Sequence, residues 1–136
     1  MNEKAEQLKA RAAAFARAVI ALCDSVPATT AGQTITRQLI AAATSVAANY
    51  RATCRARSKA EFIAKIGTVE EEADECAGWL RMLVDTKLLA EAATESLIQE
   101  ADELTAIFAA SARTAKCRMN KSRNTTLKKP PPQRSQ

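Results

Sequence analysis

Apolar residues recur every three or four positions between Ser58 and Leu83, and this spacing constrains the fold more than any other feature. It places one residue per turn on the same face of an α-helix. The apolar positions are Phe62, Ile66, Val69, Ala73, Cys76, Leu80 and Leu83. Ser58 and Glu61 form a capping box, in which both side chains accept hydrogen bonds from free backbone N–H groups. We therefore expect a long amphipathic helix from Ser58 to about Asp85, which needs partner helices to cover its apolar stripe.

Three other segments carry the same spacing and complete a set of four helices. We expect them over residues 3–25, 33–56 and 92–117. Pro27 ends the first helix, and residues 28–32 are expected to form a flexible connection. Helices of this length joined by short links predict an all-α fold, an antiparallel up-down-up-down four-helix bundle.

The charge of the chain is divided between an acidic body and a basic tail. Residues 113–136 hold eight of the 20 basic residues and none of the 15 acidic ones, which leaves residues 1–112 with a net charge of about −3. A segment of this kind is typical of an arm that binds nucleic acid or another polyanion. The basic positions of the tail are Arg113, Lys116, Arg118, Lys121, Arg123, Lys128, Lys129 and Arg134.

The composition changes near the end of the chain. Residues 120–136 contain few apolar side chains and three consecutive prolines. Such a segment cannot bury a core, so we expect a disordered, basic, proline-rich tail over residues 120–136. Residues 1–119 then form one folded domain, the four-helix bundle.

The chain contains no histidine, and its four cysteines form no C-x-x-C pair. These are unfavourable for a zinc site, and we expect neither a metal nor a cofactor. The first residues lack the apolar segment of a signal peptide, and no apolar run approaches the length of a membrane span. We therefore expect a cytoplasmic protein with free thiols and no membrane partner.

Two small polar residues, Ser45 and Asn49, lie on or beside the apolar stripe of the second helix. A buried amide or hydroxyl without a hydrogen-bond partner costs about 1–3 kcal/mol. Their expected partners are the carboxylates of Glu72 or Glu75 on the next helix, or a backbone carbonyl. We interpret these residues as a structural polar group that fixes the register of the two helices.

Several short runs in the middle of the chain together resemble a known protein family. They are SVAANYR at residues 45–51, RARSKAEFIAKI at 55–66, EADE at 72–75 and WL at 79–80. Across residues 15–89 the pattern is similar to the four-helix-bundle proteins encoded in intervening sequences of bacterial large-subunit ribosomal RNA genes. One difference is that relatives often carry a carboxylate directly after the Asn-Tyr-Arg run, where this chain has Ala52 and Thr53.

The resemblance implies a compact bundle that assembles as a ring-shaped homopentamer and has no enzymatic activity. It also implies a relation to an accessory protein of diversity-generating retroelements. That protein binds a reverse transcriptase and nucleic acid through a basic ring surface.

A second basic group lies between the second and third helices: Arg51, Arg55, Arg57 and Lys59. Arg51 and Arg55 are one helical turn apart and are expected on one face. Repeated around a ring, the group would contact phosphates with little sequence specificity. The alternative interpretation is that these arginines, Arg51 above all, pair with Glu70, Glu71 or Asp74 on the next helix.

Three functions remain open. The first is a non-enzymatic oligomer that binds RNA or DNA, or assists a nucleic-acid enzyme such as a reverse transcriptase. The second is a protein-interaction scaffold that binds no nucleic acid. The third is a magnesium-dependent nucleotide pyrophosphatase, whose metal would be held by acidic residues of the third and fourth helices. Those residues are Glu71, Glu72 and Glu75, followed by Glu100, Asp102 and Glu103.

Overall fold

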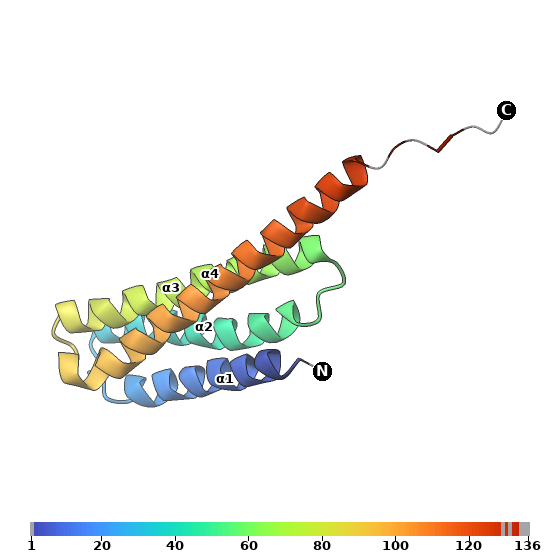
Figure 1. Ribbon diagram of the computed structural model, residues 1–136. Helices are drawn as coiled ribbons and strands as arrows, with labels where there is room; N and C mark the ends of the chain where they lie inside the picture. Colours follow the sequence, from blue (N-terminus) through green and yellow to red (C-terminus); the bar gives the residue numbers. More distant parts are fainter. Residues whose placement is uncertain (1, 129, 131, 134–136) are drawn as a thin grey trace.

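The computed structural model describes residues 2–128, 130 and 132–133, and within them it contains four α-helices and no β-strand (Figure 1). The helices are α1 (Glu3–Cys23), α2 (Thr30–Thr53), α3 (Lys59–Asp85) and α4 (Glu91–Leu127). Short links join them, and the chain turns back at each link (Figure 1). The predicted all-α class and the set of four helices are confirmed.

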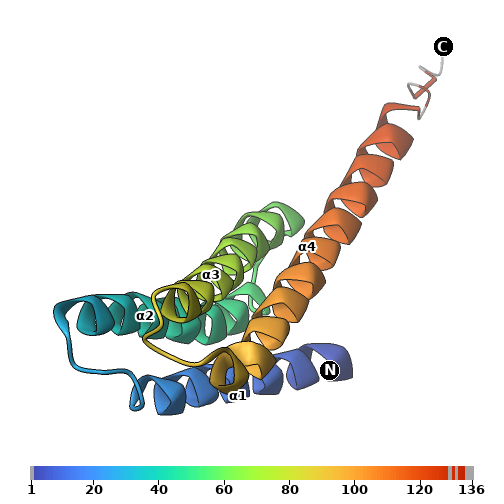
Figure 2. The same cartoon turned by 90° about the vertical axis from the view of Figure 1, so that its left-hand side faces the viewer.

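The core is centred on α3. This helix packs most extensively against α4 and α2, whereas α1 packs on α2 and meets α4 only sparsely (Figure 2). The predicted apolar stripe of α3 is fully buried from Ile66 to Leu83. The ring of Tyr50 lies against that of Phe108, with 5.3 Å between the ring centroids. Burial raises the pKa of the Cys76 thiol to about 12, with a smaller contribution from Glu75 and Glu72, so this cysteine is a neutral core residue.

The capping box at the start of α3 is present. The Ser58 hydroxyl accepts a hydrogen bond from the Glu61 backbone N–H at 3.0 Å. The Glu61 carboxylate reaches one residue further back than expected and accepts from the Arg57 backbone N–H at 3.1 Å. That hydrogen bond, together with Lys65, lowers the pKa of Glu61. The first turn of α3 is therefore fixed by side chains on both sides of the helix start.

The first link is more ordered than the sequence suggested. Thr29 caps α2 by accepting a hydrogen bond from the Gly32 N–H at 3.0 Å, so the helix begins at Thr30 instead of residue 33. The prediction of a flexible connection over residues 28–32 is thus wrong for its second half. A Cβ atom at Gly32 would lie 2.1 Å from the Pro27 carbonyl oxygen. Glycine is needed here for this close approach of the link to the helix.

The end of α2 also differs from the prediction. The helix ends at Thr53 instead of residue 56, because Ser58 adopts an extended backbone to cap α3 and the chain must reverse within a short link. Arg55 therefore lies in the link, and its predicted helical face shared with Arg51 is wrong.

The largest difference concerns α4, which continues ten residues past its expected end at Cys117 and finishes at Leu127. The prediction of disorder from residue 120 is therefore wrong for the helical part. No glycine or proline interrupts α4 until Pro130, and a helix that is already packed extends without a new nucleation step. Although α4 has 37 residues, neither it nor any other described helix is apolar enough to cross a membrane.

Candidate nucleic-acid interface

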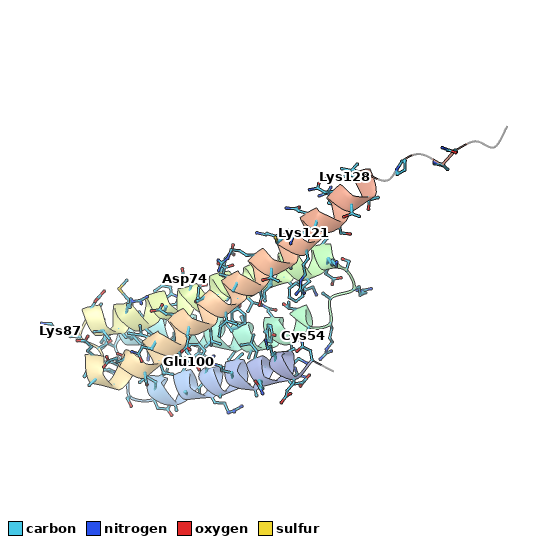
Figure 3. All side chains as sticks on the ribbon, viewed as in Figure 1. Cys54, Asp74, Lys87, Glu100, Lys121 and Lys128 are labelled. Atoms are coloured by element: carbon cyan, nitrogen blue, oxygen red, sulfur yellow. The ribbon has the colours of Figure 1, made fainter. Side chains whose placement is uncertain are left out.

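The predicted basic residues gather at one end of the molecule. The N-terminus of α1, the link between α2 and α3, and the projecting part of α4 all lie at this end (Figure 1). In Figure 3, Cys54 marks the end of α2, and Lys121 and Lys128 mark the projecting part of α4. We call this region the basic end and define it by Lys4, Arg51, Arg55, Arg57, Lys59, Arg113, Lys116, Arg118, Lys121, Arg123 and Lys128. Lys129 and Arg134, also predicted as basic contacts, lie outside the described residues.

Every residue of the basic end is exposed, and within the described part of the chain none of them forms an ion pair. The alternative interpretation, in which Arg51 pairs with Glu70, Glu71 or Asp74, finds no ion pair to support it among these residues. The positive charge of this end therefore faces solvent.

The carboxylates near the basic end are mostly engaged by other cations. Glu6 binds Lys9 at 2.8 Å, and this hydrogen bond lowers the pKa of Glu6. Glu61 binds Lys65 at 3.2 Å. Glu3 lies in the first turn of α1 and is exposed. The basic residues outnumber these acids, so the end carries a net positive charge.

The projecting part of α4, residues 113–128, is here called the arm. Its basic residues surround the helix on all sides but one. The remaining side is an uncharged stripe that continues the buried line of Phe108 and Ala112 through Ala115 and Met119, which are partly buried. Beyond Met119 every described residue of the arm is exposed. The arm is thus a basic helix that packs on the bundle along one stripe as far as Met119 and then projects from it (Figure 2).

The expected polar pair between α2 and α3 is formed by two of its candidates. The Asn49 amide donates to Glu72 Oε1 at 2.7 Å, while Glu72 Oε2 is buried and has no hydrogen-bond partner. Glu75 instead accepts from the Trp79 indole N–H at 3.2 Å, on an exposed face. Ser45 is partly buried and forms no side-chain hydrogen bond within the described residues. Among the described residues, the Asn49–Glu72 hydrogen bond is the only side-chain hydrogen bond between α2 and α3.

Sequence reasoning missed a pocket of about 800 Å³ at the basic end. Its walls come from all four helices, and the N-terminus of α1, the end of α2 and the start of α3 all contribute to it. Leu8, Tyr50, Phe62 and Ile107 line its interior, and its basic lining residues are Lys4, Arg57, Lys59 and Arg11. None of the described residues that line it is an aspartate or a glutamate. Only the tertiary arrangement brings these residues together, so no local sequence signal could have identified the pocket.

Two lining residues of this pocket have strongly altered pKa values. Burial, with a further contribution from Cys54, raises the pKa of Tyr50, so its hydroxyl stays neutral. Arg11 Nε donates to both carboxylate oxygens of Glu100 at 3.1 Å, and Arg11 also pairs with Glu103 at 3.1 Å. The bond to Glu100 raises the pKa of Arg11. Its charge is thus balanced by α4, whereas Lys4, Arg57 and Lys59 have no ion-pair partner among the residues that the structure describes.

The acidic residues proposed for magnesium on the fourth helix are held in other contacts. Glu100 and Glu103 bind Arg11, and Asp102 binds Arg81. Among the described residues, no group of three or more cysteine, aspartate or glutamate side chains could hold a metal ion. The structure therefore does not bring the two acidic groups together as a metal centre.

Comparisons with known proteins place these features in context. A family model described as 23S rRNA-intervening sequence protein matches residues 5–110. The matched region contains most of the bundle and ends just before the arm. A crystal structure of a protein of unknown function, from the S23 ribosomal protein family of Bacteroides thetaiotaomicron, is 25% identical and superposes with a TM-score of 0.71.

The similarity to that structure covers 77% of this chain and 97% of the other. No curated protein matches this chain. The family model accounts for well over half of the sequence, including the residue runs from which the resemblance was stated. The chain belongs to the 23S rRNA-intervening sequence protein family.

Proposed function

We propose that this chain is a cytoplasmic, non-enzymatic protein that binds the backbone of RNA or DNA through its basic end. The observation that carries the proposal is the arm. It is a helix with six basic residues in the described part, no acidic residue, and no ion pair to the rest of the bundle. Its shape and charge fit a polyanion better than any other partner class.

Counterion release would drive the contact between the arm and the phosphates of a nucleic acid. Each lysine or arginine that neutralises a phosphate frees a condensed cation, and affinity then falls steeply with salt. The arm is roughly 22 Å long from its rise per residue and is narrow enough to enter the major groove of a duplex. It carries charge around most of its circumference, which favours contacts to phosphates over the reading of base edges.

A ring assembly is part of the same proposal. Family membership and the resemblance stated above support an antiparallel bundle that forms a homopentamer, in which five basic ends would join into one positive surface. In one version of this function, the protein holds nucleic acid for an enzyme such as a reverse transcriptase. Light scattering on the purified chain measures the oligomer number, and a monomer at working concentration would remove the ring from the proposal.

The central experiment compares the full chain with a version that ends at Ala112. Fluorescence anisotropy with a labelled 30-nucleotide RNA, in duplex and single-stranded form, gives the affinity as a function of salt. We expect the full chain to bind at low salt with a steep salt dependence, and the shortened chain to bind far more weakly. Absence of binding by the full chain at low salt would overturn the proposal.

The scaffold alternative rests on the uncharged stripe of the arm, which continues the core seam through Ala115 and Met119. A partner helix could cover this stripe without any nucleic acid. Co-purification of a protein partner by the full chain but not by the version ending at Ala112, without nucleic-acid binding, would favour the scaffold over our proposal.

A further inference from the structure

The pocket at the basic end has an apolar and aromatic interior. Leu8 comes from α1, Phe62 from α3 and Ile107 from α4, so three helices each supply an apolar side chain. Tyr50 contributes from α2, and its ring is held in place against Phe108. Its volume of about 800 Å³ lies in the range of pockets that take small organic ligands.

The rim of the pocket has the opposite character. Lys4, Arg57 and Lys59 line it, are exposed, and have no ion-pair partner within the described residues. The helices α1 and α3 begin here and α2 ends here, so the positive ends of two helix dipoles are partly offset by the negative end of a third. Asn2 and Ser58 already accept hydrogen bonds from N–H groups in the first turns of α1 and α3. The positive character of the rim therefore comes mainly from its lysine and arginine side chains.

This combination selects a ligand with a flat apolar body and an attached anion. A nucleotide has both parts: a base that packs against aromatic and aliphatic side chains, and a phosphate that binds arginine and lysine. The pocket also adjoins the arm, because Ser111 lines its wall two residues before Arg113. A strand that leaves the pocket therefore meets the basic helix at once.

We propose that this pocket takes one unpaired nucleotide of a single-stranded nucleic acid. The base lies against Phe62 and Ile107, and its phosphate contacts Arg57 and Lys59 at the rim. This inference rests on the proposed function and deepens it, since it gives the protein a preference for single strands. A base within a duplex reaches the pocket only after it is unstacked and unpaired, which disfavours duplex binding.

The test uses a 12-nucleotide single strand with one central 2-aminopurine, whose fluorescence reports on stacking, and a duplex of the same sequence. The first variant, Ala5→Trp, adds bulk at a lining position without changing charge. We expect it to weaken single-strand binding by about tenfold, the order of effect for one lost stacked base, while duplex affinity changes by less than about twofold. Binding of this variant should also no longer change the fluorescence of the 2-aminopurine.

Two further variants keep the test decisive if Ala5→Trp disturbs the fold, which circular dichroism melting would reveal. Phe62→Leu removes the aromatic ring but keeps an apolar side chain, and it should reduce the 2-aminopurine signal and single-strand affinity. The double variant Arg57→Gln/Lys59→Gln removes the rim charges. Its matched control, Arg17→Gln/Arg37→Gln, removes the same charge from exposed positions outside the pocket and should leave the preference for single strands unchanged.

The outcomes separate the two proposals. If the unaltered chain binds both probes but shows no preference for the single strand, the pocket inference is wrong while the proposed function stands. The pocket inference is also wrong if a folded Ala5→Trp variant binds the single strand as tightly as the unaltered chain does. If the unaltered chain binds neither probe at low salt, the proposed function itself fails. Pocket-dependent binding of a glutamate-rich peptide, without any 2-aminopurine signal, would also overturn the nucleotide assignment.

Discussion

At each end of this bundle, links of similar length join consecutive helices. The links at one end pack closely against the helices, whereas the link at the other end leaves a pocket. At the closed end, which comprises residues 24–32 and 83–91, the links fold tightly against the helices. Gly32 accepts the close approach of the Pro27 carbonyl, and Lys87 adopts a left-handed backbone with φ of 60°. The N–H groups of the next two residues then donate to the Leu83 carbonyl at 3.0 and 3.2 Å. Backbone groups that a helix end leaves free are satisfied there.

The basic end lacks this closure. Its link leaves a pocket, its cations have no ion-pair partner within the described residues, and α4 continues past the bundle as the arm. Like charges held close together destabilise a fold unless something else uses them. The closed end thus holds the helices together through backbone contacts, and the open, cationic construction of the basic end supports our proposal that nucleic acid binds there.

The sharpest test of the closed end is Gly32→Ala. The new Cβ would lie 2.1 Å from the Pro27 carbonyl oxygen, so the backbone must shift. We expect the free energy of unfolding to fall by about 2–4 kcal/mol in urea denaturation. The matched control is Gly78→Ala, whose Cβ would meet nothing within 4 Å and which should gain about 0.5–1 kcal/mol. Equal stability of the two variants would show that the closed end is not tightly packed.

Removing charge from the basic end should change the affinity for nucleic acid far more than the stability of the bundle. The variant Arg113→Gln/Lys116→Gln/Arg118→Gln/Lys121→Gln removes four charges from the arm. We expect nucleic-acid affinity near 100 mM salt to fall by about 100-fold, and the slope of log K against log salt to fall by about 3–4. Anisotropy titrations measure both values. An unchanged salt slope would mean that the arm does not touch phosphates.

Between the two ends, the polar pair tests how the helices are kept in register. Asn49→Ala removes the amide that binds Glu72 and leaves a partly buried carboxylate without its remaining partner. We expect a loss of about 1–3 kcal/mol in the free energy of unfolding. The double variant Asn49→Leu/Glu72→Leu should recover most of that loss. If the single and double variants are equally unstable, the hydrogen bond is not the source of the effect.

The last expected effect concerns the core beside this pair, and it is small at neutral pH because it develops only in alkaline solution. Folding raises the pKa of Cys76 from 9.0 to about 12, so the unfolded thiol ionises first as pH rises. The contribution of Cys76 to stability is thus full below pH 9 and is lost between pH 9 and about 12, at up to about 1.4 kcal/mol per pH unit. Cys23 and Tyr50 shift in the same direction. Cys76→Ala should therefore flatten, without abolishing, the decline of stability measured by urea denaturation between pH 8.5 and 10.5.

The sequence predicted the parts of this molecule that depend on local periodicity and local capping. The stripe of α3 and its Ser58 cap follow from residue spacing alone, and the Asn49–Glu72 pair follows from the need to satisfy a buried amide. The start of α2 was missed because Thr29 is an ordinary cap among several threonines. Which threonine acts as the cap is decided by the close packing at Gly32, and that is a tertiary effect.

The sequence predicted which basic residues are candidates for binding, but not that they gather at one end of the molecule. Two basic segments more than 50 positions apart, around Arg57 and from Arg113 onward, lie at the same end of the molecule only because α4 runs back past α3. The pocket at this end depends on how all four helices are placed relative to one another, which residue spacing does not encode. The helical state of the arm was missed because its low apolar content was interpreted as disorder.

The segment of α4 beyond Met119 is wholly exposed, so its helix content depends on the solution conditions. With no neighbouring side chains to hold it, this segment depends on its own backbone hydrogen bonds, which leave a helix close to balance with the coil. Repulsion among its cations shifts the balance toward coil, and an added polyphosphate shifts it back. Amide hydrogen exchange over residues 120–127 should therefore slow on addition of a polyanion, while the rest of the molecule exchanges as before. Because salt screens the repulsion among the cations, ionic strength should also change the helix content of this segment.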